Sequence, residues 1–264
     1  MSRILAVAGK GGTGKTTLAA LVLRHLLRAE KGPFLAVDAD PDANLGVMLG
    51  ARPEKSVGQV LQDFLEQKLS IPQGMPKQQW LEFQLNTTIY ESKGLDLIQM
   101  GRPEGPGCYC SANAVLRDFL ERLSENYQAV VVDNEAGMEH LSRRTAGKID
   151  QLFMVSDASA KGIRTVLSLL ELIDELKLNP GRKFLVVCRA EKLDPRLEAQ
   201  VKKLDVEYLG AVPQDPNIVE SDLSERSLLE LPGDSPAVRA VAEIMAAAQA
   251  PAQVEPVAKV MERR

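Results

Sequence analysis

The sequence predicts an α/β fold, a mostly parallel central sheet with helices on both faces. Short apolar runs rich in β-branched residues alternate with longer segments of helical periodicity. The short runs are apolar throughout, which is typical of strands that are buried on both faces of a parallel sheet. The chain has 264 residues, 45% of them hydrophobic and 26% charged, so it is long enough to bury a large core and too apolar to be disordered.

The expected strands follow one another with helical segments between most of them. They span residues 4–8, 34–37, 95–100, 129–132, 152–155, 184–187 and 208–212. The expected helices span residues 16–29, 114–123, 162–176 and 236–248. Residues 50–94 have weaker periodicity, so we expect a variable or mobile helical insertion there, within a single domain over residues 1–249. The tail over residues 250–264 is expected to fray.

Composition excludes several classes of protein. The 32 basic and 36 acidic side chains give a net charge of −4, which argues against general nucleic-acid binding. No run reaches the roughly 18 consecutive apolar residues of a membrane helix, and the first nine residues are too short for a signal peptide. Three cysteines do not make a disulfide framework. We therefore expect a cytoplasmic protein with neither a membrane nor a nucleic acid as partner.

A glycine-rich motif connects the first expected strand to the first expected helix. Residues 9–16, GKGGTGKT, fit the pattern GxxxxGK[ST] in the strand–helix context of a P-loop. Glycines let backbone N–H groups curve around phosphate oxygens, and the helix N-terminus adds positive charge. Lys15 is expected to reach the β- and γ-phosphates, and Thr16 to complete a Mg²⁺ shell. The predicted nucleotide-binding residues of this loop are Gly9, Lys10, Gly11, Gly12, Thr13, Gly14, Lys15, Thr16 and Thr17. A glycine turn without a ligand is the alternative.

Lys10 is a second lysine within the loop, and a P-loop does not need it for its own phosphates. Its position suggests a cation aimed at a γ-phosphate in another subunit, with a solvated loop lysine as the alternative. The pattern KGGxGKT resembles the deviant Walker A class of P-loop NTPases, which includes MinD, ParA and the nitrogenase iron protein. The resemblance implies an ATPase that converts ATP and water to ADP and phosphate, catalytic roles for Lys10 and Lys15, and a homodimer that closes around the nucleotide.

Acidic residues follow two of the expected strands, whose carboxyl ends face the ligand crevice of such sheets. The resemblance places a carboxylate near the attacking water, and Asp40 is the first choice for it. Asp38 is the second catalytic candidate, beside the P-loop and the metal, and Asp42 is a weaker one; a surface acidic turn is the alternative. Asp133 ends an apolar strand in the manner of a Walker B motif, so we expect it to hold Mg²⁺ together with Thr16.

The segment after Asp133 reads NEAGMEH and corresponds to the second switch of the family. Gly137 is suited to sensing the γ-phosphate and flexing on hydrolysis. Glu135 and His140 are candidate catalysts, although a structural or switch role is the favoured interpretation of His140.

The base side of the nucleotide is less clear in the sequence. Members of the family commonly carry Asn followed by Lys or Arg after a late strand, where this chain has Cys188 and Arg189. Cysteine there weakens any side-chain recognition of adenine, so the expectation of ATP over GTP rests on resemblance. Residues 213–215 match the family's second base-side segment. The base-side residues implied by the resemblance are Arg189, Pro213 and Asp215.

Two cysteines, Cys108 and Cys110, are separated by one residue. Two thiolates fill only two of the about four positions that structural zinc or square-planar nickel takes, but two chains related by two-fold symmetry would supply four. A redox dithiol and a pair of buried, inert cysteines are the alternatives.

A narrower resemblance comes from combining these motifs. The sequences GCYC, VVVDNEAGMEHLSRRT and DADPDANL together are similar to the CooC/AcsF group, ATPases that assist nickel insertion into carbon monoxide dehydrogenase and acetyl-CoA synthase. The resemblance implies Ni²⁺ or Zn²⁺ at Cys108 and Cys110, shared across the dimer, and one of those enzymes as client. The rival functions are a MinD- or ParA-like positioning ATPase that acts on a membrane or DNA, and an iron–sulfur electron-transfer ATPase. The Ala-rich helix at 236–248 lacks Trp and Phe, which argues against a MinD-like membrane anchor.

Overall fold

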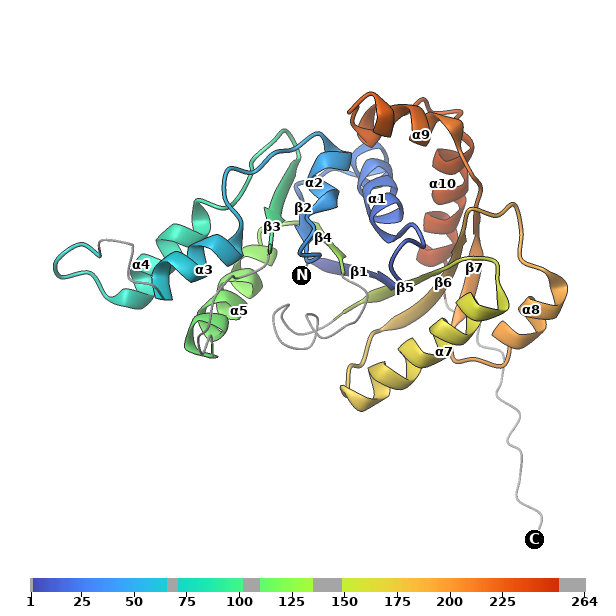
Figure 1. The fold of residues 1–264 in the computed structure, drawn as a ribbon, viewed down its shortest axis with the longest axis horizontal. Coiled ribbons are helices and arrows are strands. Elements are labelled where there is room, and N and C mark those ends of the chain that lie inside the picture. Colours follow the sequence, from blue (N-terminus) through green and yellow to red (C-terminus); the bar gives the residue numbers. More distant parts are fainter. Residues whose placement is uncertain (1, 66–70, 102–109, 135–148, 252–264) are drawn as a thin grey trace, which may run out of the picture.

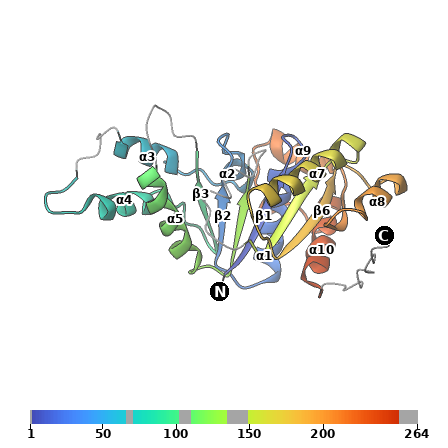
Figure 2. The same cartoon turned by 90° about the horizontal axis from the view of Figure 1, so that it is seen from below.

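The computed structural model describes residues 2–65, 71–101, 110–134 and 149–251. Within these ranges, one sheet of seven strands carries helices on both faces, as Figures 1 and 2 show. The strand order is β3-β2-β4-β1-β5-β6-β7, and neighbouring strands are parallel throughout. The strands are β1 (Arg3–Gly9), β2 (Phe34–Asp38), β3 (Leu95–Gln99), β4 (Ala129–Asp133), β5 (Gln151–Ser156), β6 (Arg182–Cys188) and β7 (Glu207–Val212). The predicted α/β fold class is confirmed.

Alternate side chains of each strand enter different cores, because neighbouring residues of a strand point to opposite faces. Leu5 and Val7 of β1 join one buried cluster, and Ala6 and Ala8 join another. The first face is covered by α1 (Lys15–Ala29), α2 (Asn44–Leu49), the 3₁₀ helix η1 (Leu228–Glu230) and α10 (Pro236–Gln249). The other face is covered by α3 (Val57–Leu65), α4 (Lys77–Asn86), α5 (Cys110–Ser124), α7 (Ala160–Glu175) and α8 (Pro195–Val201). Helix α9 (Pro216–Leu223) follows β7.

Each expected strand is present, with ends that differ by no more than two residues from the prediction. The helix expected at 114–123 begins earlier, at Cys110, and the short helices α2, α8 and α9 were not anticipated. The described part of 50–94 contains two helices, α3 and α4, so the expectation of helical structure there is confirmed for those two segments. Both helices bury one side, through Val57, Val60, Leu61, Leu81 and Leu85, in the cluster that also holds β2 and α5. They therefore share a core with β2 and α5, and they extend outward beyond the β3 edge of the sheet (Figure 1). The tail beyond residue 251 lies outside the described residues.

The core of the second half of the sheet offers a test of this packing. Phe184 on β6 and Phe153 on β5 are fully buried, with ring centroids 5.2 Å apart. We expect Phe184→Ala to lower the free energy of unfolding by about 3–5 kcal/mol, because it leaves a cavity among close-packed side chains. Phe83→Ala on α4 is the matched control, since that ring is 56% exposed, and should cost about 1 kcal/mol or less. Denaturant titration measures both, and similar losses in the two variants would contradict the assignment of the core.

Candidate functional site

Three neighbouring strands end at the same edge of the sheet, two of them in an aspartate. Gly9 ends β1, Asp38 ends β2 and Asp133 ends β4. In the parallel register Asp38 is the direct partner of Asp133, and both residues are 0% exposed. This edge is the carboxyl edge, where open parallel sheets bind their ligands.

The loop between β1 and α1 has the backbone that its glycines predict. Gly12 and Gly14 have φ of +78° and +99°, in the left-handed region that favours glycine. At Gly9 a Cβ atom would lie 2.4 Å from the carbonyl oxygen of Val155, so only glycine fits between the strands. The Thr13 hydroxyl donates a hydrogen bond of 2.7 Å to the carbonyl of Lys10, which closes the loop. The segment 9–16 is therefore a compact turn that leads directly into α1.

The two lysines of the loop lie in different surroundings. Lys15 is only 6% exposed and is close enough to Asp133 to lower the pKa of that carboxyl. Lys10 is exposed. Lys15 thus belongs to the interior of the site, whereas Lys10 is accessible to a second molecule.

Asp133 is a buried carboxylate at the end of β4. Burial raises the pKa of Asp133 to about 6, and the nearby Thr16 hydroxyl and Lys15 ammonium only partly oppose the shift. Among the described residues, neither carboxylate oxygen has a hydrogen-bond partner of good geometry. Oxygen ligands of this kind suit Mg²⁺, which keeps several waters and takes one or two carboxylates from a protein. Asp133 and Thr16 therefore fit the predicted Mg²⁺ site.

Asp38 holds the loop that follows β2. Its two carboxylate oxygens accept hydrogen bonds from the backbone N–H groups of Asp40, at 3.2 Å, and Leu45, at 2.9 Å. Burial and the charge of Asp133 raise the pKa of Asp38 to about 7, and these two hydrogen bonds offset only part of that shift. Asp40 is half-buried and Asp42 is exposed. The structure thus places Asp38 inside the site and Asp40 nearer the solvent.

A pocket of about 250 Å³ lies beside the loop, between α1 and the ends of β6 and β7. It brings together the predicted residues Gly14, Thr17, Arg189, Pro213 and Asp215. The rest of its lining is Leu18, Leu21, Cys188, Val212, Gln214, Ile218 and Val219. Most of these side chains are apolar, so the pocket suits a flat nucleobase.

Cys188 forms the wall of this pocket next to Gly14. A Cβ atom on Gly14 would lie 3.3 Å from the Cys188 Cβ, so a side chain at Gly14 would crowd the thiol. Burial raises the pKa of the Cys188 thiol to about 12, so the thiol is neutral. Arg189, the next residue, has a φ of +60°, a backbone conformation that is uncommon outside glycine and is often found at ligand sites.

The carboxylate of Asp215 has a structural role that the sequence analysis missed. One oxygen accepts hydrogen bonds from the backbone and side-chain nitrogens of Asn217, each 2.9 Å long. The other accepts from the Ser235 hydroxyl and from the backbone N–H of Ala237. Burial alone would raise the pKa of Asp215, but these hydrogen bonds outweigh it and hold the pKa below its usual value. Asp215 joins the starts of α9 and α10, and any contact with a base is left to its backbone. The sequence Asp-Pro at the start of a helix was the available signal.

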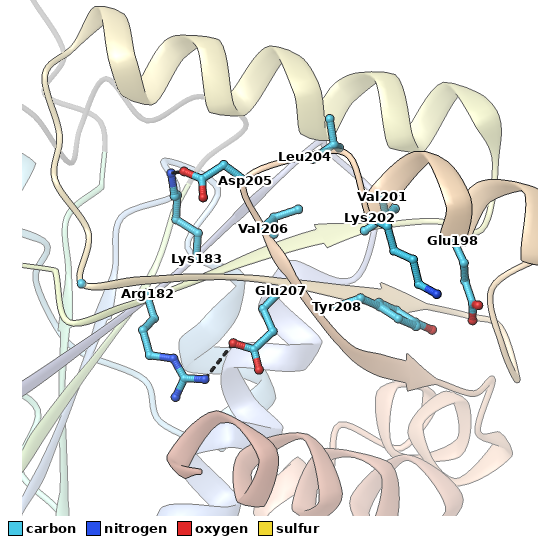
Figure 3. A pocket seen from close by; sticks show the side chains of 11 residues that line it. Arg182, Lys183, Glu198, Val201, Lys202, Leu204, Asp205, Val206, Glu207 and Tyr208 are labelled. Carbon is cyan, nitrogen blue, oxygen red and sulfur yellow. Dashed lines mark hydrogen bonds and ion pairs between the residues drawn. The ribbon is translucent and has the colours of Figure 1, made fainter. Parts of the chain in front are cut away.

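A larger cavity, of about 750 Å³, lies at the opposite edge of the sheet (Figure 3). It is lined by the first residues of β6 and β7 and by α8. Its charges partly neutralise one another: Arg182 pairs with Glu207 at 2.7 Å, and Lys183 pairs with Asp205. Since it lies at the amino ends of the strands, away from the glycine-rich loop, it is not a candidate for the nucleotide.

The expected cysteine metal site is not described by the structure. Cys108, Glu135, Gly137 and His140 lie outside the described residues, and Cys110 is described only as the first backbone position of α5. Elsewhere in the described ranges, no group of three or more His, Cys, Asp or Glu side chains is close enough to hold a metal. The same ranges contain no helix both long and apolar enough to cross a bilayer.

Residues 4–228 match the family described as the CobQ/CobB/MinD/ParA nucleotide binding domain. The chain belongs to this family. Membership in the CobQ/CobB/MinD/ParA family implies ATP or ADP with Mg²⁺ as ligands. This agrees with the loop around Lys15 and with the Asp133 carboxylate oxygens, which have no hydrogen-bond partner of good geometry among the described residues.

Individual proteins show how far the similarity extends. An uncharacterised ATP-binding protein of Methanocaldococcus jannaschii is 38% identical over 247 residues, which are 91% of this chain and 96% of the relative. The carbon monoxide dehydrogenase accessory protein CooC of Rhodospirillum rubrum is 29% identical over 259 residues, 92% of this chain and 95% of that one. The solved structure of MinD with Mg-ADP from Pyrococcus horikoshii has a TM-score of 0.68 at 20% identity, covering 94% of this chain and 96% of that chain. The last match supports the fold alone.

The raised pKa values of Asp133 and Asp38 make stability depend on pH in a defined direction. The pKa of an aspartate in the unfolded chain is about 3.8, whereas in the folded chain it is about 6 for Asp133 and about 7 for Asp38. At pH values between these limits, the folded chain therefore binds more protons than the unfolded chain. These groups therefore stabilise the fold at low pH, and that contribution is lost as pH rises through 6 to 7. Without nucleotide at about pH 8, we expect the melting temperature of Asp133→Asn to be higher than that of the parent protein. The rise should be about 2–4 °C for each kcal/mol by which the substitution increases the free energy of unfolding.

Thermal denaturation from about pH 5 to about pH 8 measures this effect, and the gap between variant and parent should shrink towards the acidic end. Asp42→Asn, which changes an exposed carboxylate of the neighbouring loop, is the matched control. A constant gap across the range would contradict the assigned pKa of Asp133.

Proposed function

We propose that this chain is an ATP-hydrolysing maturation factor that assists nickel insertion into carbon monoxide dehydrogenase or acetyl-CoA synthase. It would act as a homodimer that forms with ATP and the metal. The observation that carries the ATPase part is the buried pair of Asp38 and Asp133 beside Lys15 and Thr16. The metal and the client rest on the sequence resemblance and on the similarity to CooC.

Each residue of the site has a distinct task in this proposal. Lys15 and the loop N–H groups bind the phosphates, and the apolar pocket beside Cys188 receives the base. Asp133 and Thr16 would hold Mg²⁺, which when bound draws electron density from the phosphate oxygens. Asp40, nearer the solvent than Asp38, orients the water that attacks the γ-phosphate, and the bond from the γ-phosphorus to the bridging oxygen breaks to release ADP. Asp38 fixes the loop that carries Asp40 through its hydrogen bonds to Asp40 and Leu45.

Lys10 supports the dimer in this proposal because it is exposed within the glycine-rich loop. In a pair of facing chains, it would neutralise the γ-phosphate of the partner and so couple ATP binding to association. ATP hydrolysis removes that charge and loosens the pair.

Lys10→Ala should keep the nucleotide affinity within about twofold of that of the parent but should lose ATP-dependent dimerisation. Its rate of ATP hydrolysis should fall about 100-fold, because removing one electrostatic contact to a transferred phosphoryl group has an effect of this order. Light scattering after gel filtration, with a non-hydrolysable ATP analogue, measures the association. Lys31→Ala, another exposed lysine just beyond α1, is the control and should dimerise normally. Dimerisation of Lys10→Ala equal to that of the parent would contradict the role of Lys10.

The metal cargo is assigned to Cys108 and Cys110. One pair supplies two thiolates, and two chains supply the four that a closed metal site needs. Because the ligands are thiolates, uptake of the metal should release protons and weaken at low pH. The similarity to an accessory protein of carbon monoxide dehydrogenase supports nickel as the cargo.

Replacing both Cys108 and Cys110 with Ala should abolish stoichiometric Ni²⁺ binding and leave nucleotide binding unchanged. Anaerobic metal analysis with a non-hydrolysable ATP analogue should give about one metal ion per two chains for the parent. Cys188→Ala, which removes the remaining cysteine, should keep that ratio. Unchanged metal content in the double variant would refute the cargo assignment, and a brown protein with visible absorption would favour the iron–sulfur alternative.

A positioning ATPase of the MinD or ParA type is the second candidate, favoured by the similarity of the fold to MinD. Helix α10 counts against a membrane anchor at its position, because its apolar side, including Val241, Ile244 and Met245, is buried on the core. Pelleting with vesicles or DNA in the presence of ATP separates the candidates: ATP-dependent pelleting would support positioning, and its absence the maturation role.

A further inference from the structure

A cavity of about 460 Å³ lies between α1 and α10, on the part of α1 that is remote from the glycine-rich loop. The two helices lie side by side on one face of the sheet (Figure 1). The cavity is lined by Leu21, Arg24, His25, Arg28 and Ala29 of α1 and by Leu231, Gly233, Val238 and Ala242. Leu21 also lines the base pocket, so it forms the wall between the two hollows. None of the nucleotide-site functions uses this second hollow.

Arg24 is a buried cation with little to balance it. Arg24 is 8% exposed, and its Nη2 donates a hydrogen bond of 2.5 Å to the Leu231 carbonyl. Its Nε has no hydrogen-bond partner, and no acidic side chain of the described residues forms an ion pair with it. Burial and the neighbouring charge of Arg28 both lower the pKa of Arg24. Buried charges in proteins are normally paired, and the described residues supply no acidic partner for Arg24.

Two more basic side chains face the same hollow. Arg28 is exposed at its rim and His25 is half-buried. The acid close to His25 is Glu30, which is already engaged by Arg3 at 2.6 Å and by Gln128 and Gln249 at 3.2 Å each. No acidic residue is among those that line the cavity in the described part of the chain. Burial lowers the pKa of His25 below its ordinary value, so the positive charge of the cavity comes from Arg24 and Arg28, although the chain as a whole carries −4.

The remainder of the lining is apolar, through Leu21, Leu231, Val238 and Ala242. A purely inorganic ion would leave these side chains against water, whereas a ligand with an apolar body would cover them. We propose that this cavity binds a small organic anion, with a phosphate or carboxylate group against Arg24 and Arg28 and an apolar body against Leu231 and Val238. This site is separate from the nucleotide site, and it does not depend on the proposed function.

Phenyl phosphate is a suitable probe, because its phosphate and ring match the two halves of the lining. The protein is first saturated with Mg·ADP, so that the glycine-rich loop is filled, and the probe is then titrated calorimetrically. We expect one saturable site per chain and no binding of phenol. Arg28→Glu should weaken the binding about tenfold or more, since it reverses a charge at the rim.

Arg164→Glu on α7 is the matched control, an exposed arginine on the opposite face of the sheet, and should change the affinity by about twofold at most. Arg24→Met removes the buried charge; if it folds, it should abolish binding and melt above the parent protein in the absence of the probe. Arg28→Glu keeps the test valid if that variant does not fold.

Absence of saturable binding by the parent protein, or equal losses in Arg28→Glu and Arg164→Glu, would overturn the proposal. Because Mg·ADP affinity is measured first, a failure of the nucleotide site is recognised separately. Sedimentation with vesicles that contain phosphatidic acid identifies the source of the anion. Pelleting that Arg28→Glu abolishes assigns a lipid headgroup, and probe binding without pelleting assigns a soluble metabolite.

Discussion

Two acidic side chains, Asp38 and Asp133, lie buried as register partners at the ends of adjacent parallel strands. Burial raises the pKa of both, and the oxygens of Asp133 have no partner of good geometry among the described residues. Such an arrangement is unfavourable unless cations approach it. Lys15 and the Thr16 hydroxyl lie beside Asp133, and Asp38 ties down the loop that carries Asp40. The placement of Lys15, Thr16 and the loop that carries Asp40 is explained by the need to offset the negative charge of these two buried carboxyl groups.

Helix α1 connects the separate parts of the molecule. Its first residue is Lys15, its leucine-rich side packs into the larger core on one face of the sheet, and its middle forms one wall of the base pocket. Its last turns carry Arg24 and Arg28 into the second hollow. The P-loop and the cationic cavity therefore lie at different ends of one helix.

The sequence was sufficient for the strands and the glycine-rich loop, because both are specified locally. A fully apolar strand needs only its own residues, and Gly12 and Gly14 adopt backbone conformations that other residues disfavour. The short helices α2, α8 and α9 have too few turns to show periodicity. The role of Asp215 was out of reach for a different reason: its partners Ser235 and Ala237 are about twenty residues away and meet it only in the fold. The cation-lined cavity was likewise not predictable, because it forms only where α10, far away in the sequence, packs against α1. The Cys108 and Cys110 prediction remains a prediction, since neither side chain is described.

Proton release on Mg·ADP binding tests the central claim most directly. Calorimetry near pH 6.5, in buffers that differ in ionisation enthalpy, counts the protons exchanged. Because Asp38 and Asp133 have pKa values of about 7 and about 6 without a cation, both are partly protonated there, and Mg²⁺ should displace those protons into the buffer. The account predicts a release that is clearly smaller in Asp133→Asn. The same release from the parent and the variant, or uptake of protons by the parent, would contradict it.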